Sequence, residues 1–281
     1  MTVTDKRRIL YSSEASYLHT GFSKMARETL KRLHSYGKYD IGELASYGHP
    51  HEPRGLNNPW KYYGVLPVNQ QEAQLYQSNY NTNQFGEWKF EAVREDFKPD
   101  IFIDTRDYWM CEWQITRHKG TLDKCTPVYE VCVDSEPIPR AYIETFKQIK
   151  YHVAYSEYAK YIWKRDAGVD VIDIIPPGVD THIHIPMDKI ALKKELGLPE
   201  NVHIIQMVAR NQPRKRFDRV YESYQMFKKK NKDLARKTLL HFHTYQSVSY
   251  THLRAHETVL DLVCRLLLEK KKHKKEQNNQ S

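Results

Sequence analysis

The sequence of 281 residues predicts an α/β fold, with one complete doubly wound parallel sheet and a second α/β domain that is incomplete. Three observations predict it. Short apolar runs alternate with helical patterns up to residue 175, and a proline-rich turn at 175–180 then interrupts them. The alternation restarts near residue 203 and stops by residue 245, which is too short a stretch to cover both faces of a parallel sheet.

The first strand and helix carry the clearest patterns. The apolar run 8–11 predicts a buried strand, and the polar turn 12–20 follows it. After Gly21 the core-facing positions recur with the spacing of an amphipathic helix. These positions are Phe22, Met25, Ala26, Thr29, Leu30 and Leu33.

Later segments continue the alternation. Further strands are predicted at 39–44, 100–103, 127–133, 152–155 and 171–175, with helices at 139–150 and 157–167. Because helices separate the strands, we expect parallel pairing. The stretch from Gly48 to Trp88 is rich in Asn, Pro, Tyr and Gln, and we expect it to form an elaborated loop on the binding side.

The domain boundary is predicted at Pro176-Pro177-Gly178, because these residues end the preceding strand in a rigid turn. A helix at 190–196, a strand at 203–208, a helix with a face formed by Phe217 to Phe227 and a strand at 238–243 follow. The predicted division is therefore a domain at 1–175, a linker at 176–200, a partial domain at 201–245 and an atypical tail at 246–281. We expect that tail to be disordered or a joining artefact.

Composition narrows the classes of function. The formal net charge is +9, but residues 1–206 hold 26 basic and 28 acidic side chains, whereas residues 207–281 hold 18 and 7. A uniformly basic nucleic-acid-binding protein is therefore not expected. Four cysteines without a Cys-x-x-Cys pair, no secretory signal pattern and no apolar run of about 18–20 residues favour a cytoplasmic protein without a membrane span. Peripheral membrane contact stays open.

Common catalytic and nucleotide-binding signatures are absent from the sequence, including Gly-x-Gly-x-x-Gly, the Gly-Lys-Ser/Thr phosphate loop, His-Glu-x-x-His and Gly-x-Ser-x-Gly. Two His-x-His pairs occur, at 182 and 184 and at 241 and 243, but the sequence indicates no third ligand. We therefore expect no metal site.

Three features indicate an anion site. Gly21 follows the first strand and turn at the start of a helix, where unpaired N–H groups can bind an anion. The Pro-Gly-Val-Asp segment at 177–180 enters the second domain. Arg210 and Lys215 follow the strand at 203–208, at the end of a parallel strand where open α/β sheets bind ligands, and two cations there suit a diphosphate.

Each feature also has a structural explanation. Many α/β turns need a glycine, the proline-rich segment can be an ordinary turn, and Arg210 and Lys215 can belong to a solvated basic loop because Arg214 and Arg216 accompany them. The residues alone leave these alternatives open.

In their order and spacing the three features resemble the retaining glycosyltransferases of family 4, which have the GT-B fold of two Rossmann-like domains. Tyr155-Ser156-Glu157 also looks like the turn after the last N-domain strand of that family. The resemblance covers residues 8–245. It implies transfer of a sugar from a nucleotide-diphosphate sugar with retention of configuration, usually without a metal, and no other cofactor.

The resemblance also assigns roles to residues. Gly21, Arg210 and Lys215 are expected to bind the donor diphosphate, and the N-terminal domain is expected to hold a glycan, lipid or protein acceptor. Asp134 stands where family members often have a histidine that faces the cleft, and Glu136 follows it. These two are candidates for contact with the sugar or acceptor, although Asp134 is equally suited to cap the helix that follows.

One departure bears on activity. The paired-glutamate segment with which the family grips the donor sugar has no counterpart before residue 281, so we expect weak or no transfer by this chain. Two further hypotheses stay open. One is a non-catalytic module that binds a glycan or nucleotide, and the other is a nucleic-acid-binding protein that uses residues 207–281.

Overall fold

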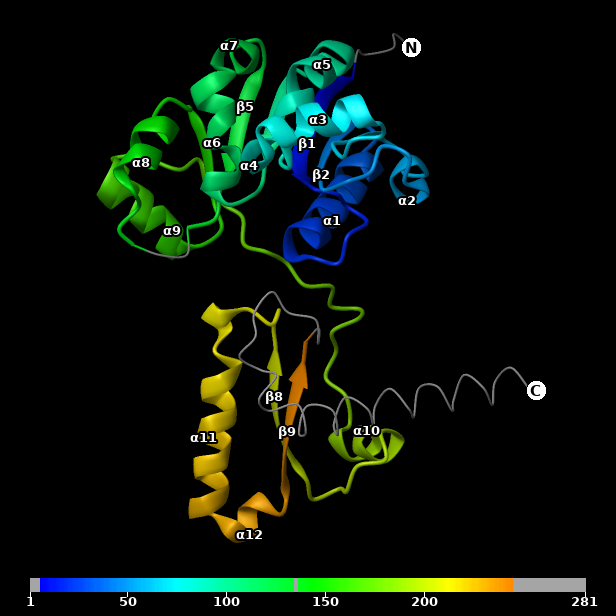
Figure 1. Cartoon of the computed structure of the whole chain (residues 1–281), viewed down its shortest axis with the longest axis vertical. Coiled ribbons are helices and arrows are strands. Elements are labelled where there is room, and N and C mark those ends of the chain that lie inside the picture. The colour runs from blue at the N-terminus through cyan, green and yellow to red at the C-terminus, as the bar shows by residue number, and fades with distance from the viewer. Residues whose placement is uncertain (1–5, 134–135, 245–281) are drawn as a thin grey trace, which may run out of the picture. The chain divides into compact units, whose positions relative to one another are not determined.

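The computed structural model describes residues 6–133 and 136–244, and the chain divides into two compact units between Asp180 and Thr181 (Figure 1). Each unit is an α/β structure with parallel strands, which confirms the predicted fold class. The tail at 246–281 and Asp134 lie outside the described residues.

The first unit is built on a seven-stranded parallel sheet in the order β3-β2-β1-β4-β5-β6-β7 (Figure 1). The strands are β1 (Arg7–Glu14), β2 (Tyr39–Ser46), β3 (Lys61–Gly64), β4 (Ile101–Asp104), β5 (Thr126–Glu130), β6 (Tyr151–Ala154) and β7 (Asp173–Ile174). The chain runs outward from β1 through β2 and β3 and then returns to the other side of β1 at β4. The strand order therefore reverses between β1 and β4, which is where doubly wound sheets open a crevice for ligands.

Helices of this unit connect successive strands. They are α1 (Gly21–Ser35), α2 (Pro53–Leu56), α3 (Gln70–Ser78), α4 (Tyr80–Asn83), α5 (Glu87–Phe97), α6 (Tyr108–Arg117), α7 (Lys119–Leu122), α8 (Arg140–Phe146) and α9 (Glu157–Ile162), which continues as a π-helical turn at Trp163–Ala167. The expectation of a loop at 48–88 is therefore wrong in part. Its residues form α2, β3, α3, α4 and the start of α5. Three of these elements, α2, β3 and α4, have only four residues each, which is too short to show a hydrophobic period.

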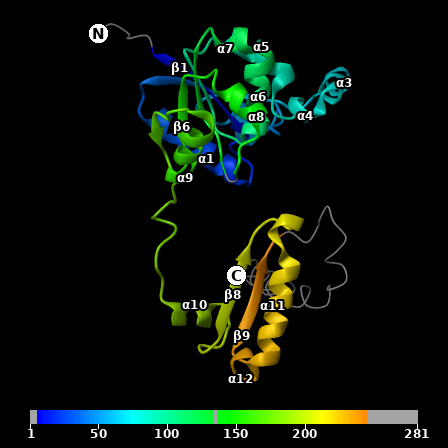
Figure 2. The ribbon, with the colours of Figure 1, turned by 90° about the vertical axis from the view of Figure 1, so that its left-hand side faces the viewer.

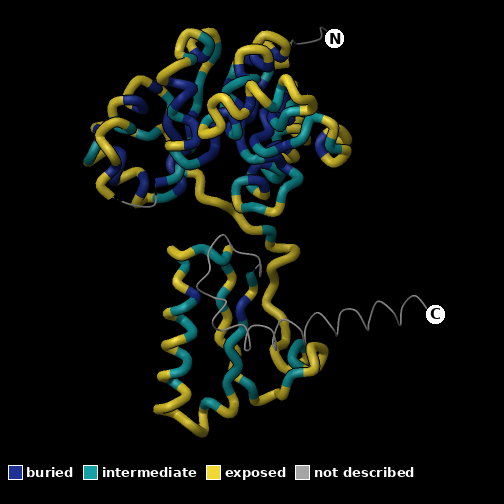
Figure 3. The backbone as a smooth tube through the Cα atoms, viewed as in Figure 1, coloured by how far each residue is buried: buried dark blue, intermediate teal, exposed yellow. Residues whose placement is uncertain are grey.

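Two apolar clusters cover the faces of the sheet. The larger one joins Leu10, Leu44, Phe102 and Tyr129 of the strands to side chains of α5, α6, α8 and α9. The smaller one places Ala26 and Leu30 of α1 against Tyr11 of β1. Parallel sheets are stable when helices shield both faces, and Figure 3 shows the buried backbone concentrated in this unit.

The second unit contains a two-stranded parallel sheet of β8 (His203–Val208) and β9 (Thr238–His243), with α10 (Lys189–Glu195), a 3₁₀ turn (Pro213–Lys215), α11 (Phe217–Lys230) and α12 (Lys232–Ala235) (Figure 2). α11 packs along one face of this sheet, where the rings of Phe217 and Phe242 lie 5.1 Å apart. Between residues 181 and 244, these two are the only large apolar side chains that are fully buried. The described part of this unit therefore has a small core.

Across the described residues, no helix has both the length and the apolar character that are needed to cross a bilayer.

Candidate functional site

One buried arginine joins the carboxyl ends of three strands of the first unit. The Arg106 guanidinium donates hydrogen bonds to Ser12 Oγ at 2.9 Å, to Ser46 Oγ at 2.7 Å and to the Phe85 carbonyl at 3.0 Å. It also forms a bidentate ion pair with Asp104, and both side chains are fully buried. Arg106 therefore fixes the carboxyl ends of β1, β2 and β4 relative to one another.

Further buried side chains surround this pair. Burial by itself lowers the pKa of Arg106, but the attraction of Asp104 outweighs it, and the pKa of the guanidinium is raised. Gln114 Nε2 donates to Asp104 Oδ2 at 2.7 Å, and Tyr129 in turn donates its hydroxyl to Gln114 Oε1 at 2.7 Å. A buried charge pair with its remaining lone pairs satisfied is rigid, but removal of one partner is costly.

A second buried carboxylate holds the loop that follows β1. Glu43 accepts from the backbone N–H of Ser16 at 2.7 Å, from its hydroxyl at 3.0 Å and from Trp60 Nε1 at 2.7 Å. Burial raises the pKa of Glu43, although these hydrogen bonds oppose the rise. Glu43 thus holds the loop that follows β1 at Ser16.

Gly21 lies where the sequence predicts it, at the N-terminus of the long helix α1. Thr20 caps this helix, because its hydroxyl accepts from the Ser23 N–H at 3.1 Å. A Cβ on Gly21 would meet no atom within 4 Å, so packing in this structure does not require glycine there. The Glu14 carboxylate accepts a hydrogen bond from the Thr20 hydroxyl and places a negative charge beside the helix end. Binding of a diphosphate by Gly21 stays a prediction.

Aromatic side chains gather at the same edge of the sheet. The ring of Phe85, which is buried, lies 5.9 Å from that of Tyr47 and 5.5 Å from that of Trp109. Trp109 is 48% exposed and Tyr80 is 47% exposed, while Tyr47 is half-buried. Burial, and then the nearby Glu14 carboxylate, raise the pKa of Tyr47 to about 12, so its phenol is protonated at neutral pH.

In the second unit, Arg210 and Lys215 lie in the loop that follows β8, as predicted. The loop is folded back on itself, since Gln212 N–H donates to the Arg210 carbonyl and Lys215 N–H donates to the Gln212 carbonyl, both at 2.9 Å. Arg216 pairs with Asp218 at 2.7 Å. By contrast, no carboxylate of the described residues lies within ion-pair distance of Arg210 or Lys215. Within the described part of the chain, no carboxylate therefore competes with an anion for these two charges.

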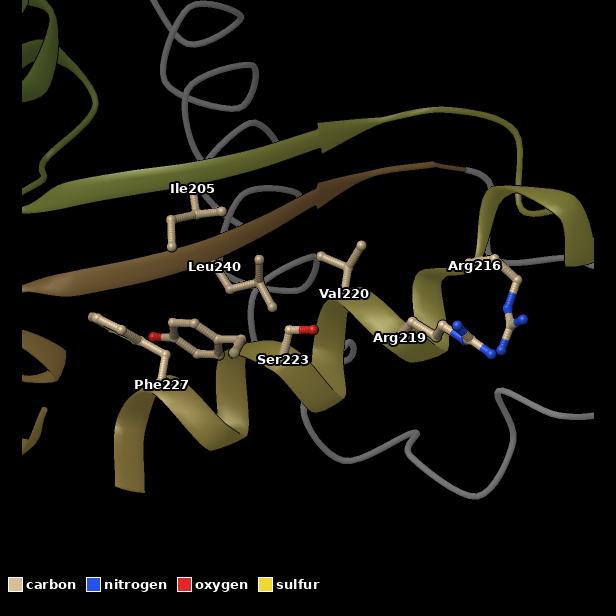
Figure 4. Close-up of a pocket in the computed structure, with 8 residues that line it drawn as sticks. Ile205, Arg216, Arg219, Val220, Ser223, Phe227 and Leu240 are labelled. Atoms are coloured by element: carbon tan, nitrogen blue, oxygen red, sulfur yellow. The ribbon is translucent and has the colours of Figure 1, made fainter. Parts of the chain in front are cut away.

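A hollow of about 410 Å³ lies between α11 and the two-stranded sheet (Figure 4). Figure 4 shows Arg216 and Arg219 at one end and Phe227 at the other, with Ile205 and Leu240 projecting from the strands. Its lining is mostly apolar and includes neither Arg210 nor Lys215. The two predicted anion-binding residues therefore do not line the hollow, although Arg216, which does, is next to Lys215 in sequence.

Glu136 is engaged in an ion pair. It contacts Arg165, which also binds Asp166 through its guanidinium. Arg165 lies 29 residues from Glu136 in sequence. Contact of Glu136 with a sugar or acceptor stays a prediction. The structure thus places Gly21 and Glu136 in the first unit and Arg210 and Lys215 together on one loop of the second.

The sequence analysis did not find Arg106, Asp104, Glu14 or the aromatic group around Phe85. The one local signal was the polar Thr-Arg-Asp segment at 105–107, directly after a strand. Among the described residues, no three His, Cys, Asp or Glu side chains lie together in a group that could bind a metal ion.

Known proteins resemble this chain in part of its sequence and in its fold. No protein-family profile matches the chain. Over 69 residues, which is 25% of the chain, the sequence is 33% identical to a D-inositol 3-phosphate glycosyltransferase of Stackebrandtia nassauensis. The match covers 16% of that relative's length, so the activity of a whole protein is a matter for proposal.

Solved structures match most of the chain. A structure of trehalose-6-phosphate from E. coli bound with UDP-2-fluoro glucose matches 89% of this chain over 68% of its own length, with a TM-score of 0.56 and 14% identity. Anabaena HepE in complex with UDP and glucose matches 94% and 67%, with a TM-score of 0.56 and 12% identity. An α,α-trehalose-phosphate synthase of Burkholderia vietnamiensis matches 93% and 70%, with a TM-score of 0.54 and 13% identity.

The fold is that of the GT-B glycosyltransferases. At these identities the likeness establishes the architecture alone, and the predicted GT-B class is confirmed. The resemblance assigned the acceptor to the first unit and the donor diphosphate to Gly21, Arg210 and Lys215, and both assignments stay predictions.

Proposed function

We propose that this chain binds a nucleoside diphosphate sugar and belongs to a glycosyltransferase that transfers the sugar with retention of configuration. The observation that carries the proposal is the Arg210–Lys215 loop at the carboxyl end of β8 in a GT-B fold, whose two cations have no acidic partner among the described residues. Matched structures that were solved with UDP and with UDP-2-fluoro glucose support uridine diphosphate as the first probe.

The chemistry follows from charge. Breaking the bond between the sugar and the diphosphate leaves negative charge on the departing phosphate oxygens, and positioned cations lower the energy of that transition state. An arginine can bind two phosphate oxygens at once, whereas a lysine supplies a compact charge. Arg210 and Lys215 lie on one short loop, so both can act on the same diphosphate.

A second candidate is a module that binds the nucleotide without turnover. It is favoured by the small core of the second unit, in which only Phe217 and Phe242 are fully buried among residues 181–244. A domain with so little buried surface is marginal by itself.

A screen of UDP-, ADP- and GDP-sugars distinguishes the candidates. Binding is measured by isothermal titration calorimetry, and turnover by release of the nucleoside diphosphate with and without saccharide acceptors. Binding with release identifies the enzyme, and binding without release identifies the module. If none of these nucleotides binds, both candidates are wrong.

A further inference from the structure

We infer that the aromatic edge of the first unit, formed by Tyr47, Tyr80, Phe85 and Trp109 with the Glu14 carboxylate, is a binding site for the pyranose ring of a saccharide acceptor. The inference rests on the proposed function, because it names the class of acceptor for that reaction. It concerns described residues of the first unit alone.

The chemistry of these side chains matches a sugar. One face of a pyranose ring carries C–H groups that pack on an aromatic ring, while its edge carries hydroxyls that need hydrogen-bond partners. Trp109 and Tyr80 offer rings that are about half exposed, and the buried ring of Phe85 supports Trp109 from 5.5 Å. Glu14 has acceptor oxygens, of which one takes a hydrogen bond from Thr20.

The position of the rings matches a ligand site. Tyr47 directly follows β2, Glu14 ends β1, and Trp109 lies in the first turn of the helix after β4. The carboxyl ends of these three strands flank the point where the strand order reverses. The rings therefore lie where an open α/β sheet binds its ligand.

The site is also held rigidly. Arg106 binds the carbonyl of Phe85 and the hydroxyl of Ser46, and these residues carry or adjoin the rings. Tyr47 has a φ of +59°, a left-handed conformation that bulky residues rarely adopt. Such strain persists only where the surroundings impose it, and it concentrates at functional sites.

One close backbone contact restrains the loop in which Tyr47 has its left-handed conformation. A Cβ on Gly64 would come within 2.7 Å of backbone atoms of Gly48, His49 and Pro50, so the end of β3 packs directly against the loop that begins at Tyr47. This contact leaves the loop little freedom to relax and keeps the phenol at the edge of the sheet.

The test uses the full chain and saturation-transfer-difference NMR with methyl α-glucoside, methyl α-mannoside, maltose and cellobiose. We expect transfer to the C–H protons of one sugar face for at least one probe. Trp109→Ala is expected to weaken that binding at least tenfold, Trp109→Phe to retain it in part, and Glu14→Gln to weaken it. Tyr158→Ala, which removes a ring that is 43% exposed on α9, is the matched control and should leave binding unchanged.

The outcomes separate this inference from the proposed function. Circular dichroism confirms folding of each variant, and UDP binding is measured on the same samples. UDP binding without transfer to any sugar probe, or sugar binding that survives Trp109→Ala, overturns the inference and leaves the proposed function in place. Sugar binding that depends on Trp109 in a chain that binds no nucleotide upholds the sugar site and overturns the proposed function. Self-association that Trp109→Ala abolishes, without sugar binding, assigns the rings to an interface and overturns the inference.

Discussion

Glu130 makes the stability of the first unit depend on pH. This carboxyl ends β5, and among the described residues no donor reaches its buried Oε1. Burial raises its pKa from 4.5 to about 7. In the unfolded chain the group ionises near its ordinary value, so between about pH 4.5 and pH 7 the unfolded state loses its proton while the folded state keeps it.

The sign and size of the effect follow from linkage. A raised carboxyl pKa means that the folded state binds more protons in this window, so the free energy of unfolding falls as pH rises through it. A difference of about 2.5 pKa units corresponds to about 3 kcal/mol above pH 7. Glu130→Gln removes the titration. We therefore expect the variant to be more stable than the parent by up to about 3 kcal/mol at pH 8 and nearly equal to it at pH 4.5.

Urea unfolding followed by tryptophan fluorescence measures this directly, because all five tryptophans lie in the first unit. The difference between the two proteins isolates Glu130 from other groups with shifted pKa values, such as His152, whose pKa burial lowers. Glu144→Gln removes a carboxyl whose side chain is 61% exposed and serves as the surface control. A Glu130→Gln difference that stays constant between pH 4.5 and pH 8 would refute the reasoning.

Two further predictions concern the same unit. Gly64→Ala is expected to lower the free energy of unfolding of this unit by about 1–3 kcal/mol, because the new Cβ would lie 2.6 Å from backbone atoms. Gly21→Ala places its Cβ where no atom lies within 4 Å, so it should change that free energy by less than about 1 kcal/mol. Equal effects in urea unfolding would contradict this contrast. Arg106→Leu is expected to lower the free energy of unfolding by about 3–5 kcal/mol, because it leaves the buried Asp104 without its ion-pair partner. The double variant Arg106→Leu/Asp104→Leu should recover part of that loss. A double variant that is less stable than Arg106→Leu alone would show that the hydrogen bonds to Ser12 and Ser46 dominate instead.

Local patterns predicted the parts of the fold that short stretches of sequence determine. The apolar run at 8–11 and the spacing of Ala26 and Leu30 predicted β1 and α1, and both helix residues are fully buried. The loop with Arg210 and Lys215 was equally visible, since Arg210 lies two residues after the end of β8 and Lys215 lies just before α11. β3 was missed because Lys-Tyr-Tyr-Gly has neither the length nor the apolar character of a typical buried strand.

The polar networks could not be predicted, because their partners are far apart in sequence. Arg106 reaches Ser12 across 94 residues and Ser46 across 60, and Glu136 meets Arg165 across 29. Only the order of the strands brings such groups together. The left-handed backbone of Tyr47 was also invisible, since tyrosine is not a residue type that signals a positive φ.

The most direct test of the central claim is calorimetric titration of the full chain with UDP, beside uridine monophosphate, for the parent and for Arg210→Ala/Lys215→Ala. Each lost charge-assisted hydrogen bond is worth about 1.5–3 kcal/mol, so the double variant should bind UDP at least a hundredfold more weakly. Lys229→Ala, which removes an exposed charge from the far part of α11, is the matched control and should bind as the parent does. We expect the parent to prefer the diphosphate to the monophosphate and the double variant to lose this preference. Equal UDP affinity in the parent and the double variant would contradict it.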